Sequence, residues 1–566
     1  MAIQTKTKYK NMAIVVISII AAVALVALVV GVVVADAAAV VEVYRMIQYD
    51  LRGVPLGSRR AAMNHHASSN LAVPGSDLSR TVIILPIAEA NITMLNEYLQ
   101  SKRLLGGLLL LFPHDYGSPT DSDSEGDGDD NYTVVRKHIA EVEQWLIHNN
   151  LPYPVYFAYE DENLINILKE VVVNDAAGRP ATAMTGGYKL VIPVADAKKL
   201  PPPTITNIQG WLPGLRTEGD NSVLPTIAIV ASYDTFGAAP ALSVGSDNSG
   251  SGVTALLELA RLFSRLYANP KTRGPYNLLF GLTAGGPYNY NGTHNWLRNF
   301  DQRIRESMEY ALCLNTIGSS SNQLWLHVSK PPDNVFIKQI HSEFVDVAEG
   351  LDLSVELRHK KINISNPRVA WEHEQFSRQR ITAATLSQLE TAPELFQHTG
   401  GISDSRRMVN ETTVVQNIKL VAESLARHIY KQQGKQIEVF AEGSSLAVNP
   451  AYVRAWLDLL SRTPRVAPFL GKNAPIVSAF YKELAEHTMD ASYHHDTLDS
   501  TFVFYDLTKA QLSVHQVASV TFDLFVMLAV GVYLGLLFLI LLVTTKGFDD
   551  LIGALRRPPS RKVKST

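Results

Sequence analysis

The chain has 566 residues, of which 46% are hydrophobic, and its 51 Lys and Arg against 54 Asp and Glu give a net charge of -3. This length predicts two or three domains, and the near-zero charge gives no indication of a nucleic-acid partner. A single cysteine, Cys313, excludes a disulfide framework, and its place in an apolar strand predicts a buried residue rather than a catalytic thiol.

Two long uncharged apolar runs set the expected topology. Ala13–Ala35 follows three lysines and ends at a small-x-small site, so residues 1–37 are predicted to be a cleaved signal peptide or an uncleaved N-terminal anchor, with the signal peptide favoured. Leu524–Val543 is long enough to cross a bilayer as a helix, and residues 544–566 form a basic tail. Positive charge on the outer flank of both runs predicts a cytosolic tail and a lumenal or extracellular body.

Residues 43–210 are expected to form a small α/β lobe of this body. Within them, Asp121–Asp130 begins like a calcium-binding EF-hand loop but has Tyr132 where that loop needs a bidentate glutamate, so a solvated acidic loop is favoured over a calcium site. Three short apolar runs bounded by turn residues are typical of buried strands: Val82–Pro86, Gly107–Pro113 and Pro154–Tyr159.

Residues 224–430 are expected to form a larger lobe. Its apolar strands alternate with helical patterns such as Ser251–Tyr267, which predicts an α/β fold with a mostly parallel, helix-covered sheet. Residues 451–519 are predicted to be a mostly helical, membrane-proximal region. The strands expected in the larger lobe are Thr226–Ala231, Tyr276–Leu282, Tyr310–Leu314, Leu324–Val328 and Thr382–Leu386.

Two histidine-containing motifs are predicted to be surface features rather than metal sites. Trp371–Gln375 lacks the second histidine of an HExxH motif, and Tyr493–Asp496 is not convincing as a ligand set. Five N-glycosylation sequons agree with a lumenal body: Asn91, Asn131, Asn291, Asn363 and Asn410.

The segments Pro225–Asp234 and Gly245–Gly252 read as a buried strand, an acid-bearing loop and a Ser/Gly-rich turn that opens a long helix. This pattern resembles the core of two-zinc aminopeptidases, a core that nicastrin and the transferrin receptor share. Such an enzyme needs imidazole and carboxylate ligands and a free carboxylate as general base. The resemblance implies that the paired glutamates should follow the strand Tyr276–Leu282, yet residues 281–297 contain no Asp or Glu.

The resemblance also implies where the remaining metal-binding residues should fall, and we call these the family metal positions. Ser232 stands where the first ligand, a histidine, is expected, and Asn315 stands where a later carboxylate is expected. Asp234, the acid that would orient the lost histidine, is retained. The bridging carboxylate falls on Asn248 or, with the alignment shifted by one residue, on Asp247. The family metal positions are therefore Ser232, Asp234, Asp247, Asn248, Asn315 and His398. The site is predicted to be degenerate, with no metal or other cofactor.

Longer strings across both lobes resemble the nicalin family, whose members share the nicastrin-like fold and likewise lack the catalytic set. The resemblance extends from about residue 43 to residue 543, and the acidic stretch and the sequons are not part of it. The strings include VYRMIQYDL at 43–51, DTFGAAP at 234–240, LLELARLFSRLY at 256–267, LHVSKPP at 326–332 and AWEHEQF at 370–376.

The resemblance implies a non-catalytic subunit of an endoplasmic-reticulum membrane complex, with one C-terminal span and a lumenal body. The implied partners are the Nodal modulator protein, transmembrane protein 147, the translocon and multi-pass membrane proteins that need help to insert and assemble. The family is also linked to restraint of Nodal signalling.

Three functional hypotheses remain open from the residues themselves. In the first, the body is a binding scaffold, and Gly531 and Gly535 allow the C-terminal apolar run to pack closely against another membrane helix. Two glycines that face lipid without a partner helix are equally compatible with this spacing. In the second, a residual metal-dependent aminopeptidase uses unrecognised ligands. In the third, the cleft is a nicastrin-like receptor for the N-termini of substrates.

Overall fold

We describe the protein from a computed structural model. It describes residues 39–71, 77–101, 104–113, 129–177, 187–216, 223–431, 438–517, 524, 527–535 and 537–538. The run Ala13–Ala35, most of the acidic stretch Asp121–Asp130 and the basic tail lie outside the described residues, as does part of Leu524–Val543.

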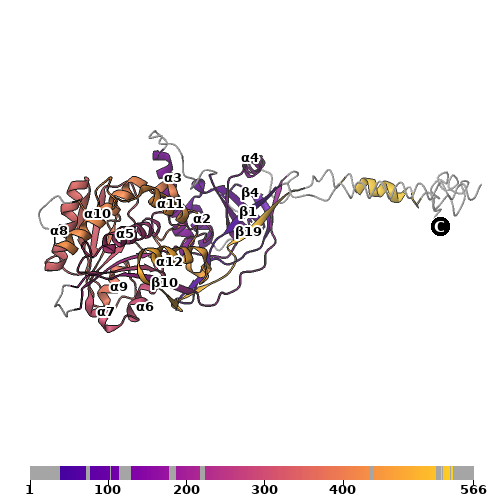
Figure 1. The fold of residues 1–566 in the computed structure, drawn as a ribbon. Coiled ribbons are helices and arrows are strands. Elements are labelled where there is room, and N and C mark those ends of the chain that lie inside the picture. The colour runs from indigo at the N-terminus through magenta and orange to yellow at the C-terminus, as the bar shows by residue number, and fades with distance from the viewer. Residues whose placement is uncertain are drawn as a thin grey trace, which may run out of the picture.

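The smaller lobe is built on a closed sheet of seven strands, on the right of the folded body in Figure 1. Alternate residues of its parallel strands fall into two separate apolar clusters, so both faces are buried, which explains their uninterrupted apolar sequences. The three strands expected here are confirmed. In sheet order the strands are β1 (Ala39–Arg45), β19 (Lys509–Gln516), β9 (Tyr188–Ile192), β4 (Met63–Ser68), β5 (Thr81–Pro86), β6 (Gly107–Phe112) and β8 (Val155–Tyr159). The helices of this part are α2 (Ile92–Gln100), α3 (Asp129–His148) and α4 (Glu162–Ala176).

The larger lobe is built on an eight-stranded mixed sheet, and all five strands expected there are confirmed. Strands β12, β11, β13 and β16 are mutually parallel, whereas β10, β17 and the β14–β15 pair join them through antiparallel contacts. In sheet order the strands are β15 (Ser354–His359), β14 (Gln323–Val328), β16 (Ala383–Ser387), β13 (Met308–Leu314), β11 (Thr226–Ser232), β12 (Asn277–Thr283), β10 (Thr204–Leu212) and β17 (Met489–Thr497).

Helices cover both faces of this sheet, as Figure 1 shows. Apolar residues of the first group of helices pack with one face of the strands, and those of the second group pack with the other. The first group comprises α5 (Gly250–Ala268), α8 (Val335–Ala348), α10 (Glu411–Tyr430), α11 (Pro450–Leu460) and α12 (Pro475–His487). The second comprises α6 (Asn291–Arg298), α7 (Gln302–Ser307) and α9 (His373–Arg378). The protein thus has the mixed α/β fold expected.

The prediction that residues 451–519 are mostly helical is wrong for their second half. After α11 and α12 the chain forms β17, then β18 (Phe502–Phe504), then β19, which closes the sheet of the smaller lobe beside β1. The period-two pattern of a half-buried strand is present in β19, because Leu512 and Val514 are buried and their neighbours Gln511, Ser513 and His515 are more exposed. The region therefore belongs to the folded body.

The predicted lobe boundary at Gly210 is also wrong, because it falls inside β10, which pairs with β12 and β17 of the larger sheet. A small four-stranded sheet adds a further connection between distant parts of the chain, and one apolar cluster runs through both lobes. Its strands are β18, β2 (Gln48–Leu51), β3 (Val54–Ser58) and β7 (Asn150–Leu151). The two lobes therefore share a core.

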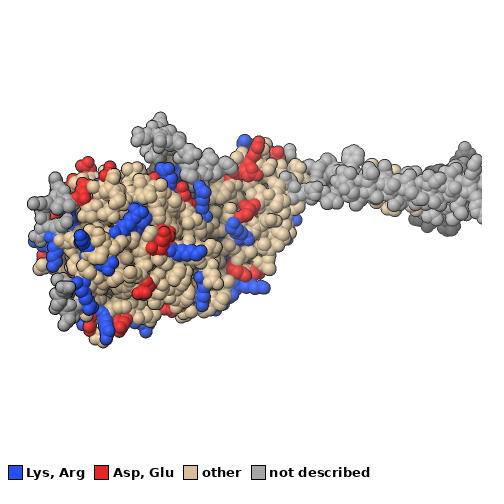
Figure 2. Space-filling model, in the orientation of Figure 1, with Lys and Arg blue, Asp and Glu red and all other residues tan. Residues whose placement is uncertain are grey.

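The C-terminal part and the surface add two observations. In the part of the chain that the structure describes, no helix has both the length and the apolar character needed to cross a membrane. On the face drawn in Figure 2, basic and acidic side chains are intermixed. That face therefore lacks the single-sign basic patch typical of nucleic-acid-binding proteins.

Candidate functional site

A small cleft lies where the parallel strands β11, β12 and β13 end, beside the first turn of α5. The carboxyl ends of parallel strands are the usual place for a site in an α/β sheet. Five of the six family metal positions line this cleft, whose cavity volume is about 60 Å³. They are Ser232, Asp234, Asn248, Asn315 and His398. The sixth, Asp247, lines a larger neighbouring cavity of about 760 Å³.

Asp234 is almost fully buried, and both of its carboxylate oxygens accept hydrogen bonds. The backbone N–H groups of Gly285 and Gly286 donate to it over 2.7 and 2.9 Å, and the Ser232 hydroxyl donates over 3.2 Å. Burial raises the pKa of Asp234 to about 6, against the opposing effect of these bonds. Asp234 therefore ties the end of β11 to the turn after β12.

That turn is the segment in which the family resemblance places the paired glutamates. A side chain at Gly286 has no room, because a Cβ atom there would lie 2.2 Å from the Ser232 hydroxyl oxygen. Gly285 has a positive φ of 76°. The turn that would carry catalytic acids in a zinc aminopeptidase instead supplies backbone donors to Asp234.

The structure separates Asp247 from Asn248, between which the sequence left a choice. Asn248 lines the cleft, whereas an Asp247 oxygen accepts a 2.7 Å hydrogen bond from the Gly318 backbone N–H. Asp404 accepts from the backbone N–H groups of both residues, over 2.9 and 2.8 Å. Burial raises the pKa of Asp247, as does the charge of Asp404, and burial raises the pKa of Asp404. A buried carboxyl, Asp247, and a half-buried one, Asp404, thus hold the turn before α5.

Asn315 and His398 approach the cleft from other sides. The Asn315 side-chain oxygen accepts hydrogen bonds from the Thr316 and Ser387 hydroxyls over 3.0 and 3.3 Å. His398 is exposed, as a surface residue would be, yet it lines the cleft. Five non-glycine residues lining the cleft have positive φ values, a kind of backbone strain that is enriched at functional sites: Ser249, Asn289, Tyr290, Phe396 and His398.

The prediction that Trp371–Gln375 is a surface feature is wrong. Glu372 and His373 are each 2% exposed. A Glu372 oxygen accepts 2.6 Å hydrogen bonds from the Thr283 and Thr293 hydroxyls, and burial raises the pKa of this carboxyl to about 7. Sequence spacing missed Glu372 because α9 brings it to the end of β12 from far along the chain. Tyr493–Asp496 lies on the edge strand β17, with its residues exposed or half-buried, as predicted.

Within the described residues, no three His, Cys, Asp or Glu side chains are grouped so that they could hold a metal ion. The side chains at the family metal positions in the cleft are one hydroxyl, one engaged carboxylate, two amides and one exposed imidazole.

Comparisons with known proteins identify relatives of the chain, although no family model matches it. The chain is 36% identical over 532 residues to a protein of Rattus norvegicus named BOS complex subunit NCLN, and the match covers 89% of each chain. It is 28% identical over 413 residues to a protein of Caenorhabditis elegans named Nicalin, with 68% of each chain covered. The chain belongs to the nicalin family. The resemblance inferred from its sequence strings is confirmed.

A solved structure of nicastrin, a component of gamma-secretase, shares the fold of this nicalin-family chain. The TM-score is 0.57 at 11% sequence identity, and the match covers 84% of this chain and 99% of the nicastrin chain. At this identity the likeness concerns the fold alone. It supports the nicastrin-like architecture expected from the sequence.

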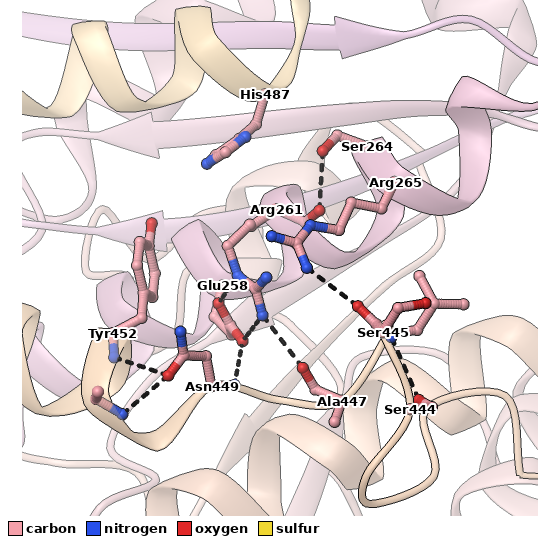
Figure 3. Close-up of polar contacts among 12 residues, drawn as sticks. Glu258, Arg261, Ser264, Arg265, Ser444, Ser445, Ala447, Asn449, Tyr452 and His487 are labelled. Carbon is pink, nitrogen blue, oxygen red and sulfur yellow. Dashed lines mark hydrogen bonds and ion pairs between the residues drawn. The ribbon is translucent and has the colours of Figure 1, made fainter.

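Helix α5, which positions the cleft in this nicalin-family chain, is anchored by a buried ion pair (Figure 3). Glu258 accepts 2.6 Å hydrogen bonds from two guanidinium nitrogens of Arg261, and the backbone N–H of Asn449 donates to it over 2.7 Å. Arg261 also donates to the carbonyl of Ala447 and lies over the ring of Tyr452. These contacts fasten the segment leading into α11 against α5.

The sequons of this nicalin-family chain differ in accessibility. Asn91, Asn363 and Asn410 are exposed, and the caps that Asn91 and Asn410 form on α2 and α10 use the side-chain oxygen rather than the nitrogen that carries a glycan. Asn291 is half-buried, and the threonine of its sequon, Thr293, is fully buried. The side chain of Asn131 lies outside the described residues.

Proposed function

We propose that this chain is a non-catalytic scaffold subunit of an endoplasmic-reticulum membrane complex that works with the translocon and helps multi-pass membrane proteins insert and assemble. Its relatives are named as subunits of the BOS complex, which supports a role within an assembly. The proposed partners are the Nodal modulator protein and transmembrane protein 147, and restraint of Nodal signalling belongs to the same proposal.

The observation that carries the non-catalytic part of the proposal is the donor set of the cleft. Zinc in proteins is held by thiolate, imidazole or carboxylate ligands. At the family metal positions, Ser232 supplies a hydroxyl, Asn248 and Asn315 supply amides, and Asp234 already accepts three hydrogen bonds. These residues do not fit a two-zinc centre. Glu372 is a further buried carboxyl, but it does not line the cleft, and one of its oxygens accepts hydrogen bonds from the Thr283 and Thr293 hydroxyls.

The proposed topology has one C-terminal span over Leu524–Val543, a lumenal body and a cytosolic basic tail, with the N-terminal run removed as a signal peptide. The charge flanking the apolar runs supports this orientation. The exposure of Asn91, Asn363 and Asn410 is compatible with a glycosylated lumenal body.

To test the proposal, the tagged full-length protein is purified from membranes in mild detergent. The proteins bound to it are identified, its zinc content is measured, and its aminopeptidase activity is assayed on a mixed substrate panel. We expect the two named partners in stoichiometric amounts, no zinc and no turnover. His398→Ala should leave the assembly intact, because this exposed side chain has no role in a scaffold. Two zinc ions per molecule with chelator-sensitive turnover would contradict the non-catalytic part, and a purified protein without partners would contradict the scaffold part.

A further inference from the structure

The exposed surface of helix α4 changes from polar to apolar along its length. Its inner face packs in the apolar cluster on one side of the closed sheet through Leu164, Ile167 and Val171. From residue 162 to residue 170 the exposed side chains are all polar: Glu162, Asn163, Asn166, Lys169 and Glu170. From residue 171 to residue 176 they are all apolar, with Val172 47% and Val173 68% exposed and Ala176 one turn further. The outer face of a solvated helix is normally polar, so the apolar half has the pattern of a surface with a partner.

Hydrogen bonds place this apolar surface at the end of the closed sheet where β19 ends. The Ser68 hydroxyl, at the end of β4, donates to Asp175 over 3.0 Å. The Tyr188 hydroxyl, at the start of β9, donates to Glu170 over 2.6 Å. Tyr188 pairs in turn with Gln516, the last residue of β19. The exposed valines of α4 lie between these two acids in the chain, and they therefore lie close to the point at which the chain leaves the sheet.

Both long apolar runs of the sequence are close to this end of the sheet along the chain. The last residue of β19, Gln516, precedes Leu524 by eight residues, so at most about 29 Å of extended chain separates the sheet from the C-terminal run. The N-terminal run ends at Ala35, four residues before β1 begins at Ala39, which pairs with Val514 of β19. A C-terminal span would thus tether this end of the sheet, with the exposed valines, close to a bilayer.

We propose that the C-terminal half of α4 lies against the lumenal surface of the membrane, with Val172 and Val173 in contact with lipid. This inference rests on the proposed topology of a single C-terminal span and a lumenal body. A short tether raises the effective concentration of the bilayer at this surface, which favours lipid over an apolar partner in solution. The neighbouring charges are compatible with this placement. Glu170 and Asp175 are hydrogen-bonded to the sheet, and the exposed Lys169 is a long basic side chain of the kind that keeps its charge among polar headgroups.

The test measures the contact of single fluorescent labels with lipid in the reconstituted full-length protein. Cys313, the single native cysteine, is fully buried, so an environment-sensitive fluorophore attaches to an introduced cysteine. The label is placed at Val173→Cys or at the control Val335→Cys, a valine that is 82% exposed on α8, at the far end of the body in Figure 1. A third label, at Leu534→Cys in the C-terminal run, reports on the span itself. The vesicles are phosphatidylcholine, with or without bromine atoms in the upper part of the acyl chains, where bromine quenches fluorescence.

Contact with lipid predicts that brominated lipid lowers the fluorescence of the Val173→Cys label about twofold, since interfacial helices bury their apolar face at the boundary of headgroups and acyl chains. The Val335→Cys label should be unaffected. If the Leu534→Cys label is quenched and the Val173→Cys label is not, the span exists and the inference is overturned. If neither is quenched, the proposed topology fails and the inference fails with it. Equal quenching at Val173→Cys and Val335→Cys would also overturn the inference, because the contact would not be specific to α4.

A matched pair of variants places the effect on the apolar half of α4. Val172→Asp puts a charge beside the label at position 173 and should reduce the quenching by about half. Asn166→Asp adds the same charge on the polar half of the same helix and should leave the quenching unchanged. Both positions are exposed, so neither variant disturbs the core. Unchanged quenching in Val172→Asp would contradict the contact.

Native membranes distinguish lipid from a partner protein as the occupant of this surface. We expect a label at position 173 to be shielded from a water-soluble quencher both in native membranes and in vesicles of lipid alone. Shielding in native membranes only would assign the surface to a partner protein and overturn the inference.

Discussion

Glu143 joins the two lobes, and its replacement tests whether the smaller lobe fixes the loop that carries His398. This α3 residue is 3% exposed and accepts hydrogen bonds from Ala238 over 2.8 Å and from Ile402, through both oxygens, over 3.0 Å. Both donors are backbone N–H groups of the larger lobe. A Cβ atom at Gly237 or Gly401 would lie 2.7 or 2.4 Å from a Glu143 oxygen, so the backbone of the larger lobe approaches this carboxylate closely.

The expected effect follows from the donors that each substitution leaves without an acceptor. An orphaned buried N–H destabilises by about 1–3 kcal/mol. Glu143→Gln keeps one oxygen, so it should destabilise by about 1–3 kcal/mol, whereas Glu143→Ala orphans both donors and should destabilise by about 2–6 kcal/mol. The assay is thermal unfolding of the full-length protein, together with limited proteolysis of the 396–404 loop.

The matched control for Glu143 is Glu141→Gln, on the exposed side of the same helix, which should change stability by less than about 0.5 kcal/mol. Faster cleavage of the 396–404 loop is expected only in the Glu143 variants. If Glu143→Gln and Glu141→Gln melt at the same temperature and are cleaved at the same rate, the reasoning about the buried carboxylate is refuted.

Three further predictions concern a buried histidine, a crowded glycine and the sequons. Burial lowers the pKa of His428, but its hydrogen bonds to Glu309 and Glu343 outweigh this and raise the pKa to about 9. The protonated histidine should stabilise the fold by up to about 3 kcal/mol, fully below pH 6.5 and progressively less as pH rises through 9. The difference in unfolding free energy between wild type and His428→Gln should therefore shrink between pH 6 and 10. A difference that does not depend on pH would contradict this assignment. Gly286→Ala should destabilise the protein by about 1–3 kcal/mol, measured by thermal unfolding, because the added Cβ meets Ser232. Gly471→Ala, at a position with open space around it, should leave the melting temperature unchanged. Equal melting temperatures of the two variants would argue against the crowding at Gly286. In protein isolated from membranes, glycopeptide mass spectrometry should find glycans on Asn91, Asn363 and Asn410 but none on the half-buried Asn291, and an occupied Asn291 would show that this turn opens before folding is complete.

Much of the architecture could be predicted from sequence because its signals are local. Continuous apolar runs marked β5, β6, β11 and β13, and the apolar stripe of α5 marked a helix packed on a sheet. Strand β17 could not be predicted this way, because it is an edge strand of mostly polar residues, all of them exposed or half-buried, and its sequence has no alternation of apolar and polar residues. Its assignment depends on pairing with β10, which is nearly 300 residues away in sequence.

The same distinction applies to the cleft. Family resemblance located Ser232, Asp234, Asn248, Asn315 and His398, and the structure brings them together. Three acids next to the cleft were not found from the sequence, because each comes from an element distant in sequence from the residues that it contacts: Glu143 from α3, Glu372 beside α9 and Asp404 from the loop before α10.

The acids around the cleft give the loops of this nicastrin-like fold a set of backbone hydrogen-bond acceptors. Asp234, Asp247, Asp404 and Glu143 each accept hydrogen bonds from backbone N–H groups of loops that meet at the ends of the parallel strands. Loops at that edge have few regular backbone partners, so carboxylates are effective at satisfying their donors. Hydrogen-bonded acids therefore hold these loops together at the ends of the parallel strands.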